Sequence, residues 1–391
     1  MSRALADRDL QAARTAWSAI LKSFGNQAGE PEEPDSFTAV PADFAPLTPA
    51  ERPKAYGIAL KYLQKMRWWR IGLDPVRTEH ALREVSDAIR GLLAARRAGS
   101  EHPDLLLAEA KAAGDFLLWA QESAGTGVFP FPAVRGGRSR AFQVAERFLA
   151  QAEAAGKAAL IATNGWLIDD LGRGDLQFDN GLCGVALFDL HEACGEEKYR
   201  KAALAAAEWA LRRPAVPNVN YNTFTTFLLC RAFRATGEVK YLESAKERMR
   251  LSVYPGQVLE GPRAGRWADA HNAKPVYHYI IVRGLASLLS ALPPEDADRP
   301  QALASLRAAL IARNHDFVEK GICNKSSAFE ALLLVKMLPG LPEMDLAGCF
   351  VEEALSALER MAVGEIRSGR GGVGPLEWGF YLEFLSRRGR G

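Results

Sequence analysis

The chain has 391 residues, of which 48% are hydrophobic and 25% charged, and its net charge at pH 7 is +2. This composition is typical of a soluble globular protein with a large core. The near balance of charge provides no basic field for nucleic acid, so we expect no nucleic-acid partner.

No stretch of the sequence approaches the roughly 18 consecutive apolar residues of a membrane helix, so no membrane partner is expected. The N-terminal residues MSRALADRDLQAARTAW lack the apolar core of a secretory signal. The chain has five cysteines and no CxxC pair: Cys183, Cys194, Cys230, Cys323 and Cys349. Most of them fall on apolar helix faces. They fit reduced core residues, which favours a cytoplasmic protein.

The first part of the chain predicts an arm. Residues 7–24 have helical spacing, and the proline-rich segment 29–49 excludes a regular element. We expect residues 1–49 to form an N-terminal helix and proline-rich arm. The arm should pack on the main body because Phe37 and Phe44 need cover.

The rest of the chain, residues 50–391, is predicted to be a single all-α domain. It is rich in Ala, Leu, Arg and Glu, which favour helices, and it lacks alternating runs of β-branched residues that would predict a sheet. The expected helices are 50–70, 77–98, 102–122, 138–155, 181–194, 198–212, 222–236, 239–251, 276–292, 300–317, 327–338, 346–363 and 376–388.

The helices repeat as hairpins. The turn Gly195–Tyr199 (GEEKY) recurs as Gly237–Tyr241 (GEVKY), and the apolar positions before each turn match. Weaker matches follow in the helices near 281 and 329. A polar pair precedes each apolar set: Asp179-Asn180, Tyr221-Asn222, His278-Tyr279 and Ser326-Ser327. If the array closes on itself, these pairs should meet around one mouth.

Residues 178–211 and 220–249 each join a polar and aromatic entry, an alanine-rich inner helix, the Gly-Glu-x-Lys-Tyr turn and an amphipathic outer helix. This pattern resembles the six-hairpin, or (α/α)6-toroid, superfamily. That superfamily includes glycoside hydrolases, unsaturated glucuronyl hydrolases, sugar epimerases and polysaccharide lyases. The resemblance implies an (α/α)6 toroid with a sugar-binding cleft at the N-terminal ends of its inner helices, and therefore a carbohydrate substrate.

The stretch 266–279, RWADAHNAKPVYHY, is the densest in side chains that titrate, stack and hydrogen-bond. Hydrolysis of a glycoside requires carboxyl groups, whereas elimination requires a His or Tyr base beside an Arg or Asn. The candidate catalytic residues are Asp269, His271, Asp179 and His278. The candidate substrate-binding residues are Trp166, Asn180, Asn220, Tyr221, Asn222, Arg266, Trp267, Asn272, Tyr277, Tyr279 and Arg283.

The residues leave several alternatives open. Asp179 also fits a helix N-cap, Asp269 a loop hydrogen bond, and each histidine a structural role. His271 and His278 lack the spacing of a helical metal pair, so no metal and no cofactor is expected. Hydrolysis, elimination and epimerisation remain possible on one scaffold. A non-catalytic repeat protein that binds a partner is a further alternative, and it predicts an open array rather than a closed one.

Overall fold

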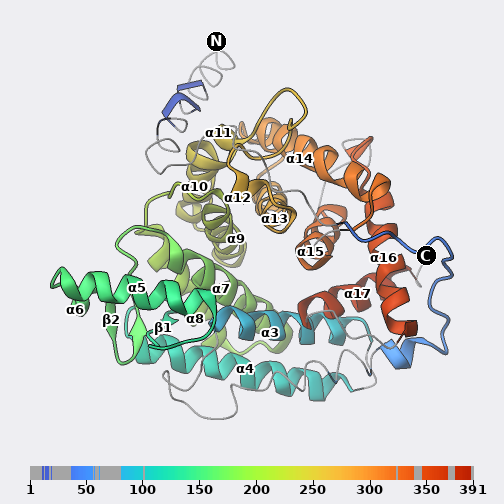
Figure 1. Ribbon diagram of the computed structural model, residues 1–391. Helices are drawn as coiled ribbons and strands as arrows, with labels where there is room; N and C mark the ends of the chain where they lie inside the picture. The colour runs from blue at the N-terminus through green and yellow to red at the C-terminus, as the bar shows by residue number, and fades with distance from the viewer. Residues whose placement is uncertain are drawn as a thin grey trace.

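The computed structural model describes residues 37–55, 81–99, 102–322, 325–338, 346–368 and 375–388, together with a few positions between 11 and 61. Helices make up most of this part of the chain (Figure 1). Within these ranges, no helix combines the length and the apolar character needed to cross a membrane. The predicted helices 7–24 and 50–70 lie largely outside the described residues.

Inner helices form a closed ring. Each packs against the next along the chain, and the last packs against the first (Figure 1). In chain order they are α3 (Leu82–Arg97), α7 (Asp175–Cys194), α9 (Val219–Thr236), α13 (Pro275–Ala291), α15 (Lys325–Lys336) and α17 (Pro375–Arg388). The closure excludes an open helical array, and it confirms the predicted (α/α)6 toroid.

Outer helices cover this ring, and each packs on the inner helix that precedes it in the chain. They are α4 (Pro103–Ala124), α8 (Glu197–Leu211), α10 (Val239–Arg248), α14 (Arg299–Glu319) and α16 (Val351–Ser368). The core lies between the two layers, where the alanine-rich faces of the helices meet.

The repeated Gly-Glu-x-Lys-Tyr turn has the same physical role in both hairpins. Gly195 and Gly237 end α7 and α9 with φ of 74° and 75°, a conformation that glycine adopts without strain. The tyrosine of each turn is buried and donates its hydroxyl hydrogen bond to an acid on the preceding outer helix. Tyr199 reaches Asp115 at 2.8 Å, and Tyr241 reaches Glu208 at 2.6 Å.

Two glycines allow the inner helices to approach closely. A Cβ on Gly181 of α7 would lie 2.6 Å from the Phe224 carbonyl oxygen of α9. A Cβ on Gly284 of α13 would lie 2.6 Å from Cβ of Thr223 on the same neighbour. Both distances are below van der Waals contact, so only glycine permits this packing, which brings the side chains of α7, α9 and α13 together inside the ring.

A segment of about 50 residues between α4 and α7 departs from the hairpin pattern. Its elements are β1 (Phe131–Pro132), α5 (Arg140–Ala154), α6 (Ala158–Ile161), β2 (Ala162–Thr163) and β3 (Trp166–Leu167). The strands pair antiparallel in the order β1-β3-β2. Because each strand has two residues, the expectation of no sizeable sheet holds in the described part of the chain.

A second irregular segment links α10 to α13. It contains the π-helical turn Met249–Val253, α11 (Tyr254–Gly256) and α12 (Ala270–Ala273). The described part of the arm also contacts the toroid: Thr38 pairs with Ile322, and Phe37 and Phe44 pack against the core. The cysteines seen in the structure, Cys183, Cys194, Cys230 and Cys349, are unpaired thiols, and Cys323 lies outside the described residues.

Candidate functional site

The N-terminal ends of three consecutive inner helices carry an aromatic cluster. Phe178, Tyr221 and Tyr277 are half-buried and pack on Leu182, Phe224 and Ile280, which face one another inside the ring. We call these six residues the mouth cluster. The rings of Phe178 and Phe224 stack with centroids 4.1 Å apart. Half-buried aromatic faces of this kind bind the apolar C–H faces of sugars.

Arg83, in the first turn of α3, lies beside this cluster. Its guanidinium is 3.9 Å from the centre of the Phe178 ring. It donates two hydrogen bonds to Asp179, at 3.0 and 2.8 Å, and its backbone N–H donates a third. Asp179 is fully buried. The carboxylate named from sequence as catalytic is therefore held by charge-assisted hydrogen bonds from an arginine.

Asp87 lies one turn further along α3, on the same face as Arg83. Its side chain is partly accessible, and it forms no hydrogen bond or ion pair with any described residue. Burial raises the pKa of Asp87 to about 7, and nearby Glu330 raises it further, while Arg90, Arg283 and Arg83 act in the opposite direction. A carboxyl with this pKa carries a transferable proton at neutral pH.

A chain of buried ion pairs crosses the ring below Asp87. It runs Arg231–Asp189–Arg90–Glu330–Arg283, through α9, α7, α3, α15 and α13. The N–O distances along it are 2.7, 3.2, 2.5 and 2.7 Å. We call these five residues the lumen network. It satisfies most of the charge inside the ring and ties five inner helices together.

The lumen network explains why Asp87 is unpaired. Arg83 is occupied by Asp179, and Arg90 and Arg283 are both held by Glu330. Each arginine near Asp87 therefore already has a carboxylate. Among the described residues, Asp87 is thus a carboxyl without an ion-pair partner beside arginines that are already paired, an arrangement that tunes catalytic acids.

Tyr221 of the mouth cluster donates its hydroxyl to Asp175, the first residue of α7, at 3.2 Å. Burial raises the pKa of Tyr221, and the negative charge of Asp175 raises it further. The phenol is therefore protonated at neutral pH and acts as a hydrogen-bond donor. Tyr221 is poorly suited to act as a base, because its phenol would first have to lose the proton that this site stabilises.

The stretch 266–279 is mostly structural. Asp269 caps α12 by accepting hydrogen bonds from the backbone and side-chain N–H groups of Asn272. Asn272 in turn accepts from Asn220 on α9, and all three residues are buried. Arg266 pairs with Asp316 of the outer helix α14 at 2.8 Å. These bonds hold the loop against the toroid and leave the Asp269 carboxylate engaged at both oxygens.

His271 is the member of that stretch that remains near the mouth cluster. Its ring is exposed and stacks on Tyr277 with centroids 3.9 Å apart. Partial burial lowers the pKa of His271, and Lys274 and Arg140 lower it further, whereas Asp269 opposes them. The imidazole is consequently neutral at pH 7 and is able to accept a proton.

The predicted polar pairs do not meet at one mouth. Asn180 bonds to Phe129 and Ala206, and Asn222 to Val216 and Ser252, so both side chains point between the helix layers. Successive helical residues are about 100° apart, so the two members of a pair cannot both face the lumen. The three pairs described in full lie inside the first turns of their helices, since α7 starts at Asp175 and α9 at Val219.

Other predicted residues also face the outer layer. His278 contacts the Ala309 carbonyl at 2.8 Å, and burial shifts its pKa well below the usual value. Tyr279 bonds to Asn314 of α14. The indoles of Trp166 and Trp267 are fully buried and donate to Ser123 and the Val253 carbonyl, which leaves no ring face open to a sugar. The side chain of Ser326 lies outside the described residues.

Arg83 and Asp87 were not among the sequence candidates, although the sequence carried a signal for both. With Arg90 they form a polar stripe at i, i+4 and i+7 on a strongly amphipathic helix. Such a stripe usually faces solvent. In a toroid the outer face of an inner helix is the apolar one, so the polar stripe of α3 faces the lumen.

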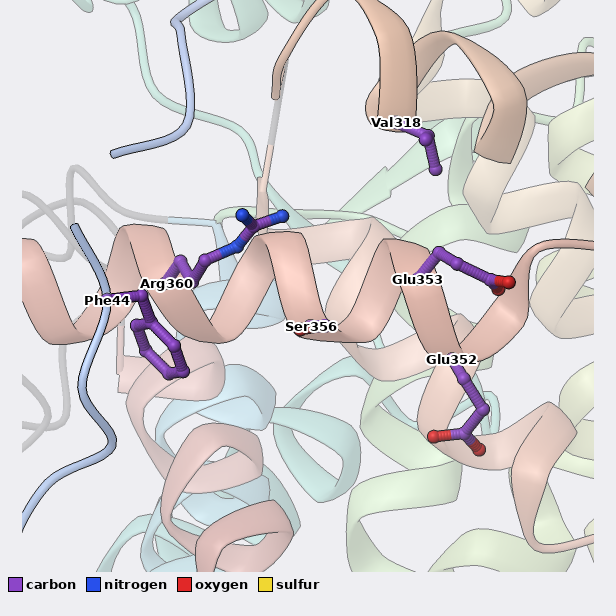
Figure 2. A pocket seen from close by; sticks show the side chains of 6 residues that line it. All are labelled: Phe44, Val318, Glu352, Glu353, Ser356 and Arg360. Atoms are coloured by element: carbon purple, nitrogen blue, oxygen red, sulfur yellow. The ribbon is translucent and has the colours of Figure 1, made fainter. Parts of the chain in front are cut away.

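Cavities and clusters elsewhere are less suited to catalysis. No group of three or more His, Cys, Asp or Glu in the described part of the chain has the geometry of a metal site. A hollow of about 570 Å³ lies on the outer surface, between the arm and helices α14 and α16. Figure 2 shows its lining residues: Phe44, Val318, Glu352, Glu353, Ser356 and Arg360. None of them faces the lumen, and the hollow is open to solvent.

Comparisons agree with the fold. No family model and no curated protein matches the sequence. Among solved structures, a polysaccharide lyase superposes with a TM-score of 0.50 at 13% identity, over 87% of this chain and 98% of the lyase. A family 88 glycosyl hydrolase from Bacteroides vulgatus gives 0.49 at 11% identity, over 86% and 99%.

A family 127 β-arabinofuranosidase gives a TM-score of 0.47 at 15% identity, and the match spans 85% of this chain but 54% of that enzyme. The match to the lyase, at 13% identity, shows the fold and not the activity. The chain accordingly has the six-hairpin (α/α)6-toroid fold.

Proposed function

We propose that this protein is a carbohydrate-active enzyme that cleaves an oligosaccharide or polysaccharide by hydrolysis, with Asp87 as the proton donor. The observation that carries the proposal is the unpaired, partly accessible carboxyl of Asp87, whose pKa burial raises to about 7. Hydrolysis needs an acid that is protonated at working pH to protonate the departing oxygen. Asp87 meets that requirement better than Asp179 or Asp269, which are held by strong donors.

The mouth cluster supports a sugar as the substrate. Tyr277 and Tyr221 offer half-buried ring faces, and their hydroxyls and the Arg83 guanidinium supply hydrogen-bond donors for sugar oxygens. Asp175, which accepts the Tyr221 hydroxyl at the mouth, is the second carboxylate that we assign to the reaction, as the group that orients water. A uronic acid in the substrate is a further part of the proposal, and the cation beside the mouth cluster that would meet its carboxylate is Arg83, which Asp179 already pairs.

Elimination is the second candidate, and one observation favours it. His271 lies stacked on Tyr277 with a lowered pKa, so a neutral imidazole is available as a base at the mouth. The same imidazole would serve a sugar epimerase. Hydrolysis is preferred because Arg83, the cation that would neutralise a uronate, is already paired with Asp179. The closed ring also favours an enzyme over a repeat scaffold, which would need an open concave surface.

A reaction screen on defined oligosaccharides separates these functions. New reducing ends indicate hydrolysis, absorbance of a new double bond indicates elimination, and changed sugar composition without cleavage indicates epimerisation. We expect reducing ends without the absorbance. If all three signals are missing across neutral, amino and uronic oligosaccharides, the enzyme proposal fails.

A further inference from the structure

The opposite end of the ring holds a second cavity, of about 350 Å³, near the C-terminal ends of α3, α7, α9 and α13. Charged side chains line it together with Phe227 and Phe380. The set includes Arg90, Asp189, Arg231 and Glu330 of the lumen network, the buried Glu383, and the more exposed Arg97, Glu192 and Arg234. None of the six residues of the mouth cluster lines this cavity, and Arg90 and Glu330, which also act on Asp87, separate the two.

Every carboxylate on the wall of this cavity is already held by an arginine. Asp189 pairs with Arg90 and Arg231, and Glu330 with Arg90 and Arg283. Glu192 is held by Arg231, and Glu383 is held by Arg97. Since these acceptors are engaged, a cationic ligand would have to break an existing ion pair to enter.

Two arginines at this cavity have hydrogen-bond donors that no described carboxylate accepts. Arg90 is 94% buried, and its Nη1 atom has no hydrogen-bond partner in the described part of the chain. Arg234, on α9 at the cavity rim, contacts the Ser290 hydroxyl at 3.3 Å and has no carboxylate partner among the described residues. The cavity lining carries four arginines, Arg90, Arg97, Arg231 and Arg234, and four carboxylates, so the formal charges of its described residues balance.

We propose that this cavity binds a small oxyanion, such as a phosphate or a carboxylate group, between Arg90, Arg231 and Arg234. The planar guanidiniums of these residues present N–H groups suited to paired oxygen atoms. The C-terminal ends of the inner helices carry partial negative charge, which opposes an anion. We therefore expect weak binding that depends on the unpartnered Nη1 of Arg90 and on Arg234.

The test uses the full-length protein and inorganic phosphate, with chloride added to keep ionic strength constant. We expect phosphate to raise Tm in a saturable manner that chloride does not reproduce. Arg234→Gln should weaken phosphate binding, so that the half-saturating phosphate concentration rises at least fivefold. Arg212→Gln, which removes an exposed arginine at the end of α8, is the matched control and should leave the curve unchanged.

Asp87→Asn distinguishes failure of this proposal from failure of the proposed function, because it should lower kcat/KM by about 100-fold or more while the phosphate response stays saturable. A phosphate response equal to that of chloride, or one lost equally in Arg212→Gln, would overturn the proposal. Because Arg234 is exposed, its variant should fold normally. Arg231→Lys serves as a second variant, since it retains the charge but loses the paired N–H geometry and should weaken phosphate binding as well.

Discussion

Asp87 and Arg90 lie one turn apart on the same face of α3, yet no ion pair joins them, because Asp189 and Glu330 hold the Arg90 guanidinium. Helical neighbours at this spacing normally attract each other. The structure instead directs the arginine to two other inner helices. The acid is left with a raised pKa, and that relationship is the basis of the proposed chemistry.

Asp87→Asn should lower kcat/KM by about 100-fold or more, the usual contribution of a general acid. KM should change little, because the amide retains the shape of the carboxyl. The measurement is release of reducing ends on the substrate found in the screen. Asp104→Asn, at the exposed start of α4, is the control and should keep full activity. Wild-type rates in Asp87→Asn would remove Asp87 from the mechanism.

The same substitution should stabilise the fold at high pH. Folding raises the pKa of Asp87 from 3.8 to about 7, so the ionised form is disfavoured in the folded state only. Stability from this group is present below about pH 4 and is lost as pH rises through 7. Asp87→Asn removes that loss, and we expect a gain in unfolding free energy at pH 8 of the order of 2 kcal/mol. Urea unfolding at pH 4.5 and 8 measures it. An equal change at both pH values would contradict the raised pKa.

The pH dependence of kcat/KM distinguishes the two candidate reactions. If Asp87 acts as an acid, activity falls as pH rises above about 7, where the carboxyl loses its proton. If His271 acts as a base, activity falls instead at acid pH, below a pKa that partial burial lowers from 6.5. We expect the alkaline limb to be the one that Asp87→Asn removes. His271→Gln should leave that limb in place.

Glu330→Gln tests whether the lumen network controls Asp87. Without the Glu330 charge, Arg90 and Arg283 are free to approach Asp87, and the pKa of Asp87 should fall. The alkaline limb of the rate profile should move to lower pH by about one unit, a change of about 1.4 kcal/mol. Breaking the buried pairs should also cost about 3–5 kcal/mol of stability.

Glu383→Gln is the matched control for this prediction. It removes a buried carboxylate that pairs with Arg97 away from Asp87, so stability should fall while the pH limb stays in place. A limb that shifts equally in both variants would assign the effect to general loosening of the ring, and the role given to Glu330 would be wrong.

The sequence predicted the fold better than it predicted the site. The helices followed from periodicity and from the repeated glycine turn, because local chemistry ends an inner helix at Gly195 and Gly237. The closed ring followed from the resemblance to the six-hairpin superfamily. The direction in which individual side chains point could not be predicted from the sequence. His278 and Trp267 look functional in a polar loop, but their direction depends on the packing of α13 against α14 and on the π-helical turn, which no local pattern specifies.

The sequence also concealed Asp87. A polar stripe on an amphipathic helix has the same pattern whether it faces solvent or a lumen, and the partners that isolate Asp87 come from residues about 90 to 240 positions away, namely Asp179 and Glu330. Only the closed ring brings them together.

Substitutions at Trp267 and Tyr277 should separate a structural from a substrate-binding aromatic. Trp267→Phe loses the hydrogen bond to the Val253 carbonyl and leaves a cavity, so it should destabilise the fold by about 1–3 kcal/mol with an unchanged KM. Tyr277→Ala removes a half-buried ring of the mouth cluster and should raise KM roughly tenfold, equivalent to about 1.4 kcal/mol, with a smaller loss of stability. Thermal unfolding and Michaelis kinetics on the two variants measure both effects. If Trp267→Phe raises KM and Tyr277→Ala does not, the substrate lies against the loop 266–279 and the mouth cluster is not its binding surface.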